Sequence, residues 1–368
     1  MSLVVAGRIA LSLALGSVLL VGCARFDDSA SSPFTPEPTF NPAEPKSPQQ
    51  NPSQRARPTG PCIDPDPNVI TTCLDSTGGI IAFGDDAMVA ERRTGRIYKT
   101  VPVDPSDPQS PPVLVNQVDV DGSGDGGITD IALSPTYRED GLIYAYITTA
   151  SDNRVVRIAE NGPPKDILTG IPKGSVGNHG ALEFVSPTEL LVLTGNAGNP
   201  GLASAPSSLA GKVLRINSPS PGANAEVVVS GLGIAGDLCD DGKDSVWITD
   251  RTATEDRLQR LAKDGTVTTA WTWPDRPGVA GCAAGPDVVA IAMSGAKALA
   301  IANPDANTHA VTAAPTFIVQ DKYGRLGGAA AGGDGTVWAT TVNNDDNHGP
   351  FDDRVIKIPP PSSSTGPD

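Results

Sequence analysis

One acidic segment of this sequence has residue types and spacing that suggest metal chemistry. Over residues 119–130, oxygen-bearing side chains stand at the first, third and fifth positions, glycine at the sixth and a carboxylate at the twelfth, as in EF-hand loops. The pattern is incomplete, because the eighth position is Gly126 instead of an aliphatic residue and no flanking helices are predicted. The segment is therefore either a calcium site or a solvated turn. The candidate calcium ligands are Asp119, Asp121, Ser123, Asp125 and Asp130.

Other motif searches return little. The three histidines, at positions 179, 309 and 348, are scattered and lack the local spacing of a zinc site. Residues 231–236 match GxGxxG, but a turn and another strand-like run follow instead of the helix that a pyrophosphate needs. The polar segment 343–353 is interpreted as a loop on the rim of the fold.

Four cysteines lie in the body of the chain, and their even number predicts two disulfides in an exported protein. Proximity favours a bridge between Cys62 and Cys73. The other pair, Cys239 and Cys282, occupies similar places in two segments assigned below to neighbouring repeats, which would bring their Cα atoms within bridging range. The alternative is four buried free thiols.

Composition narrows the class of protein. The 368 residues include 42 acidic and 27 basic side chains, and the formal net charge of −15 disfavours a nucleic-acid partner or an anionic lipid surface. Aromatic residues make up only 4% of the chain, whereas 40 glycines and 35 prolines argue against a helix-rich protein. The 39% apolar and 19% charged content still suits a globular body.

Short apolar or alternating runs bounded by turn residues predict an all-β body beyond residue 60. They recur as a glycine-led strand of small residues, a strand with an apolar centre, and a strand ending in Arg-Ile or similar. Six units, roughly 45–55 residues apart, predict a six-bladed β-propeller over residues 61–360, with small residues lining its channel. A β-sandwich or a two-domain arrangement is the alternative. The repeat strands are 88–98; 127–135, 142–147 and 154–158; 180–184, 190–194 and 211–216; 236–238, 245–250 and 257–261; 280–283 and 288–292; and 327–330, 336–340 and 354–358.

The first 23 residues have the form of a bacterial lipoprotein signal. Arg8 precedes an apolar run too short to span a bilayer, and Gly22 stands just before the lone Cys23. We expect removal of residues 1–22, acylation of Cys23 (palmitate), a disordered Pro- and Ser-rich tether over 23–60 and a disordered tail over 361–368. The protein would then be anchored on the extracytoplasmic face of the cell membrane. The alternative is an ordinary signal peptide in which Cys23 is incidental.

Four motifs, in order, resemble those of the soluble quinoprotein glucose and sorbosone dehydrogenases, which have six-bladed propellers. They begin at Met88, Gly126, Thr194 and Leu209, and the resemblance covers most of residues 80–358. The whole chain is also similar to mycobacterial lipoproteins of the cell envelope, through segments that include residues 22–26, 152–157, 164–173 and 271–284.

The quinoprotein resemblance implies pyrroloquinoline quinone and calcium as cofactors, but several of its functional positions have changed. The histidine that serves as the family's base falls at Gly177, and His179 is a weak candidate two residues later, which a change of register would rescue. The arginine and asparagine that hold the quinone fall within residues 231–235, which contain neither. Only Asp125 stands where the family has a polar residue near the cofactor.

The sequence therefore favours a lipid-anchored propeller that binds an unidentified protein, glycan or small molecule at its channel mouth without catalysis. No cofactor is predicted firmly, and quinone-dependent oxidation of a sugar or alcohol is the alternative. A purely structural role in the envelope is a second alternative. A histidine facing an arginine across the channel mouth would favour the enzyme.

Overall fold

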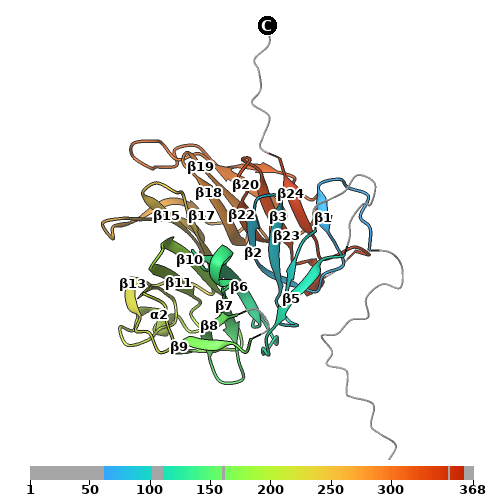
Figure 1. The fold of residues 1–368 in the computed structure, drawn as a ribbon. Coiled ribbons are helices and arrows are strands. Elements are labelled where there is room, and N and C mark those ends of the chain that lie inside the picture. The colour runs from blue at the N-terminus through green and yellow to red at the C-terminus, as the bar shows by residue number, and fades with distance from the viewer. Residues whose placement is uncertain (1–61, 102–110, 160–161, 347–348, 360–368) are drawn as a thin grey trace, which may run out of the picture. The chain divides into compact units, whose positions relative to one another are not determined.

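The computed structural model describes residues 62–101, 111–159, 162–346 and 349–359, which form a six-bladed β-propeller (Figure 1). Within this part of the chain, 24 strands make six antiparallel sheets of four strands each. The predicted fold class is confirmed. The expected signal peptide, Cys23, the tether and the C-terminal tail lie outside the described residues.

Each blade runs from an inner strand at the channel to an outer strand at the rim. Blade 1 comprises β2 (Thr77–Phe83), β3 (Asp86–Glu91), β4 (Arg96–Lys99) and β5 (Val113–Gln117). Blade 2 comprises β6 (Ile128–Leu133), β7 (Ile143–Thr148), β8 (Asn153–Ile158) and β9 (Lys165–Ile171). Blade 3 comprises β10 (Gly180–Ser186), β11 (Glu189–Thr194), β12 (Lys212–Asn217) and β13 (Glu226–Ser230).

The second half of the ring repeats the pattern. Blade 4 comprises β14 (Ala235–Asp240), β15 (Ser245–Arg251), β16 (Asp256–Ala262) and β17 (Val267–Trp273), and blade 5 comprises β18 (Val279–Gly285), β19 (Val288–Met293), β20 (Ala298–Ala302) and β21 (Thr316–Ile318). Blade 6 comprises β22 (Leu326–Ala331), β23 (Val337–Thr341), β24 (Val355–Ile358) and β1 (Val69–Thr71). The short helices are α1 (Tyr137–Asp140), α2 (Pro200–Ser204) and η1 (Asn343–Asp345).

The inner strands are rich in small residues because neighbouring blades approach closely at the channel. A Cβ atom on Gly78 of β2 would lie 2.2 Å from the carbonyl oxygen of Ile128 on β6. Between blades 5 and 6, a Cβ on Gly281 would lie 2.4 Å from the backbone nitrogen of Ala329. Side chains larger than hydrogen would push these blades apart, which confirms the predicted reason for the glycine-led strands.

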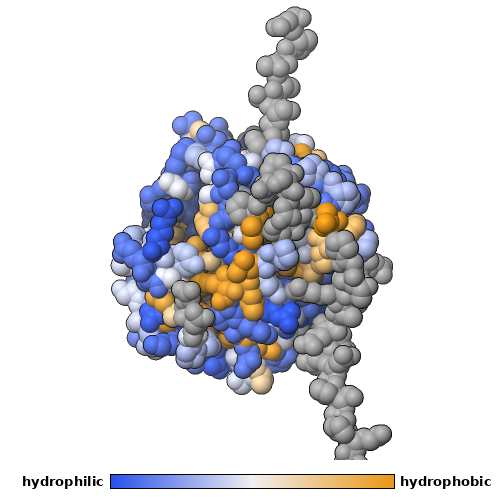
Figure 2. All heavy atoms as spheres, turned by 45° about the vertical axis from the view of Figure 1, so that its right-hand side comes forward, coloured by the Kyte–Doolittle hydropathy of each residue, from blue (hydrophilic) through white to orange (hydrophobic). Residues whose placement is uncertain are grey.

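The hydrophobic core lies between the faces of adjacent blades. Six buried clusters occur in the described residues, and each draws its members from two neighbouring sheets. Trp247 and Trp338, both 1% exposed, anchor two of them. The face drawn in Figure 2 shows apolar residues gathered in a central area with hydrophilic residues around it.

The ring closes between the two ends of the described chain. Strand β1 pairs antiparallel with β24 and so completes blade 6 with residues that precede blade 1. The two predicted disulfides are present: Cys62 bonds to Cys73, and Cys239 on β14 bonds to Cys282 on β18, each with Cα atoms 5.8 Å apart. The second bridge joins the inner strands of blades 4 and 5. Across the described ranges, no helix is both long and apolar enough to cross a membrane.

Candidate functional site

The channel opens into a polar cavity of about 370 Å³ at the end where the inner strands begin. The first residues of the inner strands form its wall, and loops between blades supply its charged groups. We call this cavity the mouth pocket. Its charged and imidazole side chains are Arg92, Arg93, Asp125, Asp130, His179, Asp237, Arg251, Arg325 and Asp345.

Arg251 differs from the other three arginines of the mouth pocket because it has no ion pair among the described residues. It ends β15, where its backbone pairs with Ala235 at the start of the inner strand, so its side chain reaches the pocket. Nη2 donates to the carbonyl of Val279 at 2.7 Å and to Oγ of Ser294 at 3.0 Å, both uncharged. Nε is buried without a hydrogen-bond partner, and Arg251 forms no ion pair among those of the described chain. Burial of this guanidinium lowers its pKa from the usual value.

Arg325 lies near Arg251 and has only a long ion pair. Its Nη1 is 3.7 Å from Oδ2 of Asp346, and its Nε is buried without a partner. The positive charge of Arg325 contributes to the lowered pKa of Arg251, so the two cations repel each other across the pocket. Two guanidinium groups in one cavity, one without an ion pair and one with only a long ion pair, make a site for an anion.

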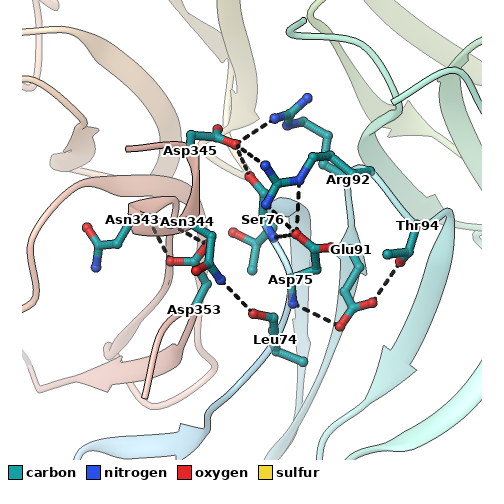
Figure 3. Close-up of polar contacts among 12 residues, drawn as sticks. Leu74, Asp75, Ser76, Glu91, Arg92, Thr94, Asn343, Asn344, Asp345 and Asp353 are labelled. Carbon is teal, nitrogen blue, oxygen red and sulfur yellow. Dashed lines mark hydrogen bonds and ion pairs between the residues drawn. The ribbon is translucent and has the colours of Figure 1, made fainter. Parts of the chain in front are cut away.

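The other two arginines of the pocket are neutralised by aspartates at the ring closure. Figure 3 shows the first of them, Arg92, beside Asp345. Arg92 donates from Nη2 to Oδ1 of Asp345 at 2.7 Å, and its Nη1 donates to the carbonyls of Gly124 and Gly126. Arg93 donates from Nε to Oδ1 of Asp75 at 2.9 Å. These two side chains hold three loops together and are less available to a ligand than Arg251.

His179 precedes β10 and projects into the same pocket as Arg251. Burial lowers the pKa of its imidazole to about 4, with Arg251 and Arg92 adding to the effect and Asp125 opposing it. The ring is therefore neutral at neutral pH, and its Nδ1 is buried without a hydrogen-bond partner. A neutral imidazole in a cavity can accept a proton or a hydrogen bond.

Asp125 also lies in the pocket, but its carboxylate is occupied by the loop that carries His179. Oδ2 accepts a hydrogen bond from the backbone N–H of Gly177 at 2.6 Å, and Oδ1 accepts from the side-chain amide of Asn178 at 2.8 Å. The side chain is therefore a positioning group for this loop. The hydrogen bonds to this loop occupy most of the acceptor sites of Asp125, which leaves little of the carboxylate for a cofactor.

The structure does not bring the five candidate calcium ligands together. Asp121 pairs with the ammonium of Lys173, whose hydrogen bond lowers the pKa of that carboxyl to about 2, while Asp119 and Ser123 are exposed. Asp130 belongs to β6 and accepts from the N–H of Leu182 at 2.7 Å. No group of three or more metal-binding side chains forms within the described ranges. The geometry therefore gives no support to the calcium-loop interpretation, because residues 128–130 continue into a strand and carry Asp130 away from the other candidate ligands.

Below the mouth, the channel wall carries carboxylates on three consecutive inner strands. They are Asp130 on β6, Glu183 on β10, and Asp237 and Asp240 on β14. Burial, together with the mutual repulsion of these groups, raises the pKa of Glu183 to about 8, and burial raises that of Asp237 to about 7. The pKa of Asp130 is also raised, mainly by burial and then by Asp237.

The residues at the family's cofactor positions do not fit a quinone. The base position is Gly177, whose N–H is bonded to Asp125, and the clamp positions include Gly233 and Ile234, which offer no polar side chain. A Cβ on Gly233 would lie 1.8 Å from the carbonyl oxygen of Arg251, so backbone fills this position. No reaction step is assigned to a quinone here.

Comparison with known proteins places this geometry in context. Residues 74–231 match the family model described as Glucose / Sorbosone dehydrogenase. The PQQ-bound aldose sugar dehydrogenase of Streptomyces coelicolor is 29% identical, with 79% of this chain and 96% of that chain covered and a TM-score of 0.69. A putative glucose dehydrogenase of Thermus thermophilus is 22% identical (79% and 98% covered, TM-score 0.67). The soluble aldose sugar dehydrogenase of Escherichia coli is 18% identical (80% and 99% covered, TM-score 0.65).

A comparison with curated proteins found no match. The findings above support a β-propeller of the glucose/sorbosone dehydrogenase-like kind, as the motifs predicted. The Streptomyces structure has a bound quinone, and that property belongs to that protein. For this chain, the comparisons establish the scaffold and leave the use of the mouth pocket to be argued from its own residues.

Sequence reasoning missed six charged residues of the pocket: Arg92, Arg93, Asp237, Arg251, Arg325 and Asp345. Arg251 lies one residue beyond the predicted repeat strand 245–250, and Asp345 lies in the segment interpreted as a polar rim loop. The rim-loop interpretation is wrong, because Asn343, Asn344 and Asp353 are buried and Asp345 faces the pocket (Figure 3). A useful signal was available: arginines directly before or after a strand predicted to lie at the channel can reach the mouth.

Proposed function

We propose that this protein is a lipid-anchored envelope protein whose mouth pocket binds a small anionic ligand without catalysis. The observation that carries the proposal is Arg251: a half-buried guanidinium with an unpartnered Nε and no carboxylate partner among the described residues. A buried charge without a counter-ion is costly. An anionic ligand would supply that counter-ion, and the nearby Arg325 would bind the same ligand.

The size of the pocket indicates the kind of ligand. A cavity of about 370 Å³ suits a small molecule and is too small for a folded partner. Carboxylates, phosphates or sulfonates are the groups that guanidinium binds with two parallel hydrogen bonds. Among the open alternatives of protein, glycan and small molecule, the charge and size of the pocket favour a small anion.

The proposed location at the membrane is supported by the N-terminal sequence. Cys23 would carry the lipid, and the tether would hold an acidic propeller away from the membrane. A Cys23→Ser variant should leave the detergent phase for the aqueous phase on detergent phase separation and should lose palmitate labelling. The resemblance to mycobacterial envelope lipoproteins supports the same location.

One observation favours a second function, quinone-dependent oxidation of a sugar. His179 and Arg251 line the same pocket, and the imidazole is neutral. The family's own base and clamp positions argue against it, since they hold glycine and isoleucine. Addition of pyrroloquinoline quinone and calcium with a range of aldoses should give no dye reduction. Turnover that disappears in His179→Ala would establish the enzyme and contradict the non-catalytic proposal.

Binding is tested with naphthalene-1,3,6-trisulfonate, a planar trianion that stays ionised at every working pH. Isothermal titration should show one site, and Arg251→Gln should weaken binding by about tenfold or more. Arg138→Gln is the matched control, because Arg138 lies exposed on α1 away from the pocket. Equal binding by the wild type and Arg251→Gln would refute the mouth pocket as the anion site.

A further inference from the structure

The two halves of the channel wall differ in chemistry below the mouth pocket. The inner strands β6, β10 and β14 carry carboxylates, whereas β18, β22 and β2 line the channel with glycine and apolar side chains and with Thr77 at the mouth. No titratable side chain from these last three strands lines either cavity in the described part of the chain. The carboxylates therefore face uncharged neighbours across the channel and one another along it.

Two of the carboxylates line the mouth pocket together with the arginines. Asp130 and Asp237 line both the mouth pocket and a second cavity of about 320 Å³ deeper in the channel, which Glu183 and Asp240 also line. Gly79 and Gly328 also line both cavities. An anion held by Arg251 would therefore share the mouth pocket with Asp130 and Asp237.

We propose that anion binding at the mouth pocket is coupled to proton uptake by the channel carboxylates Asp130, Glu183 and Asp237. This inference rests on the proposed function and specifies how the site is regulated. Ionised carboxylates repel an anion at the mouth, and each proton taken from solvent onto a carboxylate oxygen removes one such charge. By linkage, a bound anion also makes these carboxylates bind protons more tightly.

The hydrogen bonds in the channel leave these carboxylates weakly stabilised in their charged form. Asp237 accepts from the N–H groups of Cys282 and Leu238, and Asp130 accepts from Leu182, but none of the three carboxylates has an ion pair among the described residues. Their raised pKa values agree with this geometry, and those of Glu183 and Asp237, about 8 and about 7, place proton uptake by these two groups near neutral pH. The other titratable and charged groups of the two cavities are Asp240 in the deeper cavity and, in the mouth pocket, Arg92, Arg93, Asp125, His179, Arg251, Arg325 and Asp345.

The test uses the full chain and naphthalene-1,3,6-trisulfonate, whose charge does not change with pH. Affinity should be about fivefold or more higher at pH 6 than at pH 8.5. Titration at pH 7 in two buffers of different ionisation enthalpy should show net proton uptake on binding. His179 and the arginines do not change charge in this interval, because the pKa of His179 is about 4.

Asp130→Asn/Asp237→Asn should bind at pH 8.5 about as tightly as the wild type does at pH 6, with less proton uptake. Asp287→Asn is the matched control, since Asp287 is 68% exposed and lines neither cavity. Arg251-dependent binding that is independent of pH and takes up no proton would overturn the coupling and leave the proposed function standing. Failure of the trianion to bind at either pH would overturn both.

Discussion

Lys212 is a cation buried in the wall of the fold with no carboxylate partner in the described chain. Its side chain is fully buried, and Nζ donates to the carbonyls of Leu202 and Ala210, each at 3.2 Å, and of Ala203. Burial lowers the pKa of its ammonium group. The three bonds fix α2 against β12 below the rim of blade 3.

Lys212→Met should lower the free energy of unfolding by about 1–3 kcal/mol, because it leaves buried carbonyls without donors. Urea unfolding followed by circular dichroism measures the change. Lys243→Met, at a site 54% exposed, is the control and should change stability by less than about 0.5 kcal/mol. A Lys212→Met protein as stable as the wild type would mean that desolvation of the ammonium cancels its hydrogen bonds.

Asp125 should control the order of the loop that carries His179. Asp125→Ala removes acceptors from the N–H groups of Gly177 and Asn178, so hydrogen exchange at these amides should accelerate by about 10- to 100-fold. Asp119→Ala, at an exposed position of the same segment, should leave that exchange unchanged.

Calcium should not alter the melting temperature of either variant or of the wild type. Stabilisation by calcium would support a metal site in this segment.

The individual residues of the mouth pocket were the features that the sequence predicted least well. His179 was recognised because it stands next to a family motif, but its distance from Arg251 could not be known. Arg251 contacts Val279 and Ser294, which are 28 and 43 residues away along the chain. Such contacts depend on which strand ends meet at the channel mouth, and only the closed ring determines that.

The strands were predicted better than the pocket residues, because the residue pattern that indicates a strand lies within the strand itself. The glycine-led inner strands of blades 2 to 6 were found in the right places, since the close approach of blades excludes side chains there, but β2 of blade 1 was missed. Several outer strands were missed: β9 shows exposed and buried residues without strict alternation, and β21 has only three residues. Their pairing partners at the blade edges, not their own sequence patterns, hold them as strands.

The disulfide between β14 and β18 should contribute more stability than the one near residue 62. It closes 43 residues of chain against 11, and loop-closure entropy predicts about 4 kcal/mol for the longer loop and about 3 kcal/mol for the shorter. Cys239→Ala/Cys282→Ala should therefore have the lower midpoint in guanidinium chloride compared with Cys62→Ala/Cys73→Ala. The reverse order would show that the first bridge stabilises the ring closure beyond its loop length.

At the scale of the whole molecule, the ring closure was not foreseen. Thr72 donates to the carbonyl of Phe351, 279 residues away, and Asn344 donates from its side chain to the carbonyl of Leu74 at 2.9 Å (Figure 3). Polar residues in a long segment before the last strand look like a solvated loop in the sequence. They are buried because the two ends of the propeller meet around them, which a local pattern cannot reveal.

The channel carboxylates predict how the stability of the propeller depends on pH. Glu183 and Asp237 have pKa values of about 8 and about 7, above those of an unfolded chain, so the folded state binds more protons between pH 4 and pH 8. Stability from these groups is complete at low pH and is lost as pH rises through their folded pKa values. His179 has the opposite shift, to about 4, but it changes protonation only below about pH 6.5, so the carboxylates act alone from pH 6.5 to 8.

The free energy of unfolding should therefore fall by about 1–3 kcal/mol between pH 6.5 and pH 8. Glu183→Gln should flatten this dependence and be more stable than the wild type at pH 8, because its amide carries no charge into the channel. Asp287→Asn, which removes an exposed carboxylate, should keep the wild-type slope. Urea unfolding at several pH values measures all three. A wild-type curve that rises over this interval would mean that the carboxylates are ionised and well hydrated, and would remove the basis for proton-coupled binding at the mouth.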